Sequence, residues 1–120
     1  MGTWIDLLEP NALDSLIQNH REQQRVKGTR EERDFVPVAK LFCPWGAATW
    51  LLSECAPDGL AFGLCDMGFG SPELGYVSLD EVYAIKGPGG IRIEQDVFWK
   101  GDKPLSRYAD EARVRGRIVD

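Results

Sequence analysis

The sequence predicts an α+β domain in which a mostly antiparallel sheet of about five strands packs against helices. Short apolar runs follow one another between residues 35 and 77, and the segments joining them are too short to hold crossover helices. Helical spacing of apolar residues is confined to the two ends of the chain and to one short segment after residue 78. The expected element order is therefore α-β-β-β-β-α-β-α, with an N-terminal helix, a short capped helix and a C-terminal helix.

The N-terminal helix is indicated by Pro10, which suits a first helical position, and by apolar residues such as Leu13 and Leu16 at helical spacing. Its end is expected near Val26, because Gly28 follows. The chain is expected to be a single domain, 1–120, and is described most simply as two parts. These are an N-terminal helix with a charged linker (1–34) and an α+β core (35–112).

Four strands are expected before the short helix. The segment Ala56-Pro57-Asp58-Gly59 has the composition of a tight turn, so the runs on either side of it should form a hairpin. Pro37 places the first run at a sheet edge or at the start of a strand. The expected strands are 35–42, 48–54, 60–65 and 74–77.

The last third of the chain contains a capping box, a strand and a helix. Ser78 and Glu81 have the spacing at which hydroxyl and carboxylate satisfy each other's free backbone donors at a helix start. Residues 91–99 alternate apolar and mostly polar side chains, which predicts a half-buried strand with Phe98 on its polar side. A closing helix should follow Pro104, and one face of it carries Leu105, Tyr108, Ala109 and Ala112.

Composition narrows the expected location and chemistry. The chain has no run approaching the roughly 18 apolar residues of a membrane span, and its first residues lack a secretory pattern. The cysteines number three, an odd count, and lie within apolar runs, which favours free buried thiols in a reducing compartment. We therefore expect a cytoplasmic protein that makes no use of a membrane.

Charge is distributed unevenly along the chain. The formal net charge of −5 argues against tight binding to a phosphate backbone but leaves direct nucleic-acid contact open. No Lys or Arg occurs between Cys43 and Ile85, whereas basic residues gather near both ends. The acidic middle is either a face for a basic protein partner or a buried sheet with a few solvated loop carboxylates.

The sequence offers little catalytic apparatus. The single histidine, His20, lies in the polar part of the first helix, and the cysteine spacing does not match zinc ligands. Glu94 and Asp96 would share one face of a strand, where they could bind a divalent ion or simply face solvent. We expect no enzyme activity, no cofactor and no metal.

Candidate partner contacts come from the aromatic residues of two loops and from the acidic middle. Trp45 and Phe69 lie in loops flanked by Gly and Pro, where they are expected to be exposed and able to anchor an interface. The carboxylates of the same region could meet a basic partner. The candidate contacts are Glu54, Asp58, Asp66, Glu73, Trp45 and Phe69.

Several segments together resemble a family of small bacterial domains of unknown function that are carried on plasmids, phages and other mobile elements. The pattern is carried by Lys40–Pro44, Thr49-Trp50, Glu54, Phe62–Leu64, Glu73–Leu79 and Ile93–Trp99. It spans roughly residues 35 to 109, and the first 34 residues carry no part of it. One branch of this family resembles Cas9-inhibiting anti-CRISPR proteins.

This resemblance implies a function without catalysis. The expected function is a macromolecule-binding protein of mobile genetic elements, acting as an anti-CRISPR inhibitor of a type II (Cas9) effector by stoichiometric binding. Its partner would be a guide-loaded CRISPR effector nuclease, whose Lys- and Arg-lined channels the acidic middle could face. The alternative is an accessory factor in plasmid maintenance or conjugation that contacts nucleic acid through the basic ends of the chain.

Overall fold

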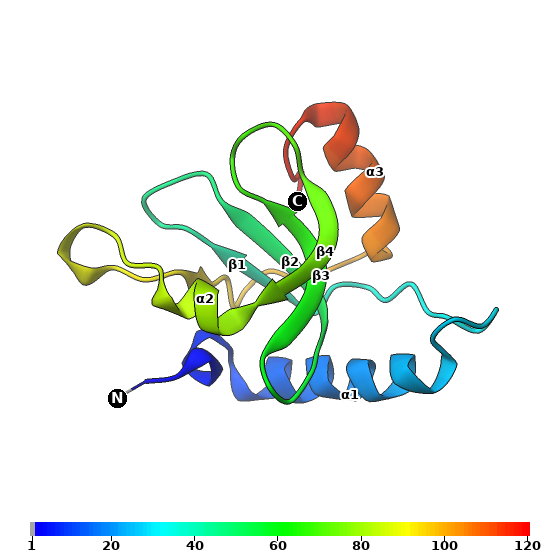
Figure 1. The fold of residues 1–120 in the computed structure, drawn as a ribbon. Helices are drawn as coiled ribbons and strands as arrows, with labels where there is room; N and C mark the ends of the chain where they lie inside the picture. The colour runs from blue at the N-terminus through cyan, green and yellow to red at the C-terminus, as the bar shows by residue number, and fades with distance from the viewer. Residues whose placement is uncertain (1) are drawn as a thin grey trace.

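The computed structural model describes residues 2–120, and a five-stranded antiparallel sheet forms its centre (Figure 1). The strand order is β4-β3-β2-β1-β5. Strands β1 to β4 therefore lie side by side in chain order, and β5 pairs with the free edge of β1. The α+β fold with helices near both ends is confirmed. The strands are β1 (Ala39–Phe42), β2 (Thr49–Cys55), β3 (Leu60–Asp66), β4 (Glu73–Ser78) and β5 (Glu94–Gln95).

The sheet buries apolar side chains on both faces. Trp50 and Leu52 of β2 belong to the core formed with α1 (Pro10–Val26), whereas Leu51 belongs to the core formed with α3 (Leu105–Arg115). Successive side chains of a strand point to opposite faces, so this division follows from the alternation along β2. The two long helices accordingly lie on opposite sides of the sheet (Figure 1).

The N-terminal helix and the charged linker pack against the rest of the domain. Leu16 of α1 is fully buried in the core. Gln23 and Arg33 exchange two hydrogen bonds, in which the Gln23 amide donates to the Arg33 carbonyl (2.7 Å) and accepts from its N–H (2.9 Å). The Asp34 carboxylate accepts the N–H of Ser106 at 3.1 Å. Residues 27–34 therefore fold back along α1 and reach the start of α3.

The short helix α2 (Leu79–Ala84) begins as predicted. The Ser78 hydroxyl accepts the N–H of Glu81 at 3.3 Å, which satisfies one of the free donors of the first turn. Leu79 and Val82 are buried against the core. The predicted helix start and the Ser78 half of the predicted capping box are thus confirmed.

Two strand predictions are wrong in length. The strand expected over 91–99 is reduced to Glu94–Gln95, because the Asp96 carboxylate accepts the N–H of Phe98 (3.1 Å) and turns the chain. The strand expected over 35–42 begins only at Ala39, since Pro37 has no N–H for a sheet hydrogen bond. None of the helices within residues 2–120 is both long and apolar enough to span a bilayer.

The antiparallel pairing gives the sheet two distinct ends. Phe42, Thr49 and Asp66 are aligned across β1, β2 and β3, so the β1–β2 loop (43–48) and the β3–β4 loop (67–72) lie together; we call this the loop end. The β2–β3 turn (56–59) lies at the opposite end, which we call the hairpin end. This separation determines which of the candidate residues can act together.

Candidate functional site

The structure divides the candidate contacts between the two ends of the sheet. At the loop end lie Trp45, Asp66, Phe69 and Glu73, and at the hairpin end lie Glu54 and Asp58. These six residues therefore cannot form one continuous face. Each group has to be considered separately.

Phe69 dominates the loop end, because its side chain is 88% exposed. Trp45 is partly covered, since its indole lies directly on Gly87, where an added Cβ would come within 2.5 Å of the ring. Glu73, the first residue of β4, is exposed. The loop end thus presents one fully accessible aromatic ring beside one accessible carboxylate.

Asp66 supports this loop from inside the molecule. It is only 3% exposed, and its two oxygens accept the N–H groups of Gly68 (2.8 Å) and Ile118 (3.0 Å). The carboxylate therefore connects the start of the β3–β4 loop to the C-terminal segment. Its hydrogen bonds position the loop that carries Phe69, and the residue also lines a hollow between this loop and the C-terminal segment.

Glu54 occupies the hairpin end at an irregularity of β2. The β2–β3 register shifts between Leu52 and Glu54, as in a β-bulge, and bulges of this kind often redirect a side chain. Glu54 lies directly opposite Phe62, which in turn lies opposite Tyr76 of β4. Because directly opposed residues share a face, the carboxylate and the two aromatic rings point to the same side of the sheet.

Glu54, Phe62 and Tyr76 form one wall of a cleft of about 240 Å³, which we call the Glu54 cleft. The end of α1 and the linker that follows it form the other wall. His20 Nδ1 lies 3.8 Å from Glu54 Oε1, and Lys27 Nζ donates to the Tyr76 hydroxyl at 2.6 Å. The rings of Phe62 and Tyr76 meet edge to face with centroids 5.1 Å apart. Sequence reasoning missed all of these neighbours of Glu54.

Burial controls the electrostatics of the cleft. Removal from water raises the pKa of the Glu54 carboxyl, and the nearby charges of His20 and Lys27 lower it by less. The hydrogen bond to Tyr76 raises the pKa of Lys27. Asp58, in contrast, is exposed at the turn and accepts the N–H of Leu60 at 3.1 Å. Glu54 is therefore the chemically distinctive carboxylate of the hairpin end.

The paired carboxylates and the cysteines singled out from the sequence form no metal site within residues 2–120. Glu94 lies in β5, but Asp96 lies in the turn that follows and is engaged by Phe98, so the two no longer share a strand face. Within residues 2–120, no group of three or more His, Cys, Asp or Glu side chains is placed to hold a metal ion. Burial raises the pKa of Cys55 to about 12 and that of Cys65 to about 11.

The thiol pKa values lead to a direct prediction. Treatment of the native protein with iodoacetamide at pH 8 should modify Cys55 and Cys65 at least about 100-fold more slowly than a free thiol, because the thiolate is the reacting species. Peptide mass spectrometry of timed samples measures both rates, and denatured protein provides the control in which every thiol reacts. Rapid native modification of Cys55 would contradict its complete burial.

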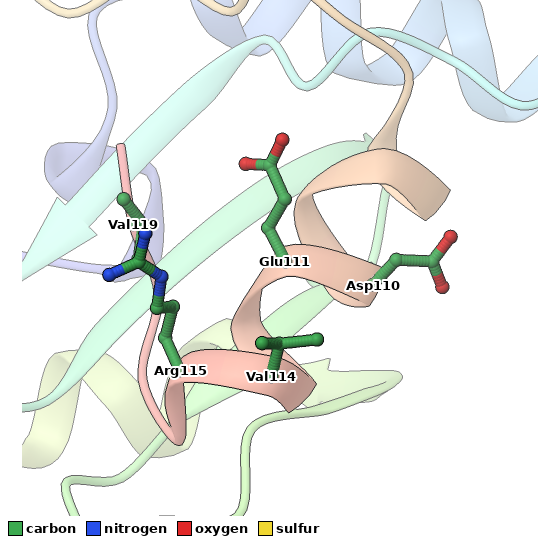
Figure 2. A pocket seen from close by; sticks show the side chains of 5 residues that line it. All are labelled: Asp110, Glu111, Val114, Arg115 and Val119. Atoms are coloured by element: carbon green, nitrogen blue, oxygen red, sulfur yellow. The ribbon is translucent and has the colours of Figure 1, made fainter.

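A further hollow lies between α3 and Val119 of the C-terminal segment (Figure 2). The carboxylates of Asp110 and Glu111 point away from each other, and Val114 is exposed on the same helix. Glu111 pairs with Lys103 at 2.9 Å, and Asp110 pairs with Arg113 at 2.8 Å. The two carboxylates of this hollow are thus already paired, and they do not converge on a common point.

The fold and these two ends define a small α+β domain with a displayed aromatic loop and an acidic–aromatic cleft. The chain belongs to the family described as "Protein of unknown function (DUF2958)", whose model matches residues 7–119. The match begins within the N-terminal segment, so α1 and the linker are part of the family pattern, contrary to the expectation that it starts near residue 35. No curated protein and no solved structure matches the chain.

Proposed function

We propose that this chain is a non-catalytic domain that binds a basic protein partner stoichiometrically, with Phe69 as an anchor. The observation that carries this proposal is the exposure of Phe69 on a loop fixed by the buried Asp66 carboxylate. An exposed aromatic ring on a held loop loses little conformational freedom when it enters a pocket of a partner. Such residues supply a large share of the affinity at many protein interfaces.

Charge supports a basic partner. The chain carries a formal net charge of −5, and exposed carboxylates lie at both ends of the sheet, with Glu73 at the loop end and Asp58 at the hairpin end. A field of one sign speeds encounter with a partner of opposite charge and disfavours contact with nucleic acid. Of the arginines at the two basic ends, Arg33 is paired with Glu22 and Arg113 with Asp110.

The finer proposal is that the partner is a guide-loaded CRISPR effector nuclease of the Cas9 type. It is supported by the sequence resemblance given above and by the charge of the chain. Cas9-type effectors hold the guide–target duplex in a positively charged channel, so an acidic protein could compete for that surface. The chain would then act as an inhibitor by occupying the effector in a one-to-one complex, without a chemical step.

The test is a titration of the chain into a guide-loaded Cas9 cleavage assay, with DNA binding measured in parallel. We expect dose-dependent loss of cleavage, and we expect Phe69→Ala to weaken the effect about tenfold or more. Phe98→Ala is the matched control, because Phe98 is 92% exposed but lies beyond β5, the sheet edge opposite β4. The parallel measurement distinguishes a block of DNA loading from a block of a later step.

Two outcomes would contradict the proposal at different levels. Absence of both binding and inhibition at large molar excess would remove the Cas9-type partner. Equal effects of Phe69→Ala and Phe98→Ala would remove Phe69 as the anchor. Binding of the chain to DNA at low salt, with an affinity that falls steeply as the salt concentration rises, would instead favour nucleic-acid contact.

A further inference from the structure

The Glu54 cleft contains a buried carboxylate that, within residues 2–120, is not ion-paired with any lysine or arginine. Glu54 is 6% exposed, and within residues 2–120 the only ion pair formed by its side chain is with His20, which carries charge only when protonated. Two stronger bases line the cleft but are engaged elsewhere. Lys27 donates to Tyr76, and Arg33 pairs with Glu22 at 3.1 Å. A cation that binds beside a buried carboxylate without an ion-pair partner lowers the free energy of that carboxylate.

The wall beside Glu54 is suited to a positively charged group. Phe62 and Tyr76 form an edge-to-face pair, and Tyr76 is 55% exposed, so its ring is accessible from the cleft. Lys27 already places its ammonium 5.2 Å from the centroid of the Tyr76 ring. Aromatic faces attract cations by their quadrupole, and the chain's own lysine demonstrates that a cation is accommodated here.

We propose that the Glu54 cleft binds an arginine side chain of the protein partner, with its guanidinium paired to Glu54 and placed beside Tyr76. This inference rests on the proposed function, since it names the group of a basic partner that the hairpin end recognises. Arginine is preferred to lysine because its planar guanidinium is weakly hydrated, matches a carboxylate with two hydrogen bonds and stacks on aromatic rings.

The dimensions of the cleft agree with a single side chain as occupant. Its volume of about 240 Å³ is below the range of about 300–1,000 Å³ typical of sites for cofactors and drug-sized ligands. Lys27 is the internal competitor, because its ammonium holds the position over Tyr76 that an incoming cation would approach. Removal of the Lys27 charge should therefore strengthen binding, whereas removal of the Glu54 charge should weaken it strongly.

The experiment is a ¹H–¹⁵N NMR titration of the whole chain with Nα-acetyl-arginine N-methylamide. The matched control probe is the corresponding citrulline derivative, which has nearly the same shape and no charge. We expect saturable shifts at Glu54, Phe62 and Tyr76 with the arginine probe only. Glu54→Gln should weaken binding at least tenfold, and Lys27→Met should strengthen it about two- to fivefold, the range of an exposed charge interaction.

Several results would overturn this inference. They are equal shifts with the citrulline probe, unchanged binding in Glu54→Gln, and no saturable shift in a folded Lys27→Met variant. The dispersion of the amide spectrum shows that each variant is folded. Failure here leaves the Phe69 test untouched, because Phe69 lies at the opposite end of the sheet. Conversely, arginine binding without any effect on a nuclease would remove the proposed partner and retain the cleft.

Discussion

Gly63→Ala is expected to destabilise the fold by about 3 kcal/mol, a large part of the roughly 5–15 kcal/mol that stabilises a typical domain. A Cβ at Gly63 would lie 2.1 Å from the carbonyl oxygen of Leu51, which is a backbone atom of the neighbouring central strand. The register shift of β2 after Leu52 accompanies this close approach. Only glycine fits at position 63, because any side chain there would collide with the neighbouring strand. A glycine beside a bulge commonly marks such a close approach of two backbones.

Gly75→Ala is the matched control. Gly75 lies directly opposite Gly63 on β4, but within residues 2–120 nothing lies within 4 Å of the position of its added Cβ. Its substitution should leave stability unchanged or raise it by up to about 1 kcal/mol, because alanine has less freedom than glycine in the unfolded chain. Urea unfolding followed by tryptophan fluorescence measures both variants. Equal destabilisation of the two would show that the close approach to Leu51 is not the cause of the loss at Gly63.

Much of this fold could be predicted from local sequence. The turn at residues 56–59, the Ser78 cap and the buried face of α3 each depend on residues within a few positions of one another, and the structure contains all of them. The two overextended strands were mispredicted for a comparable reason. Alternation alone favours a strand over 91–99, but the hydrogen bond from Phe98 to the Asp96 carboxylate turns the chain after Gln95.

The candidate site was far less accessible to sequence reasoning. Glu54, Phe62 and Tyr76 are brought together by strand register, and the shift after Leu52 cannot be read from hydrophobic pattern. His20 and Lys27 reach the cleft only because α1 packs along β2, a contact between segments more than 25 positions apart. In the sequence these residues look like the solvated tail of a helix and the interior of a sheet.

Burial also separates carboxylates that the sequence groups together. Glu54, Asp58, Asp66 and Glu73 were expected as one acidic contact set, but two are exposed and two are buried. The buried pair differ in their partners. Asp66 accepts two backbone N–H groups, whereas Glu54 faces a cleft. A carboxylate fixed by backbone donors stabilises the fold, whereas a charged one left facing a cleft costs free energy that a cationic ligand or protonation recovers.

Glu54→Gln and Asp66→Asn should consequently change stability in opposite directions. We expect Glu54→Gln to raise the free energy of unfolding at pH 7 by about 1 kcal/mol, because it removes a poorly paired buried charge. Asp66→Asn should lower it by about 2 kcal/mol, because the amide cannot accept both N–H groups. Both values come from denaturant unfolding of each variant at several pH values.

The dependence on pH identifies the cause of the Glu54 effect. Its pKa is higher in the folded chain than in the unfolded chain, so the neutral acid stabilises the fold at low pH. That contribution is lost as pH rises from the unfolded value, about 4.3, through the folded value. The advantage of Glu54→Gln should therefore vanish below about pH 4. If instead Glu54→Gln destabilises the protein at pH 7 as Asp66→Asn does, the Glu54 carboxylate is a structural anchor, and its assignment as the arginine-binding group loses its energetic basis.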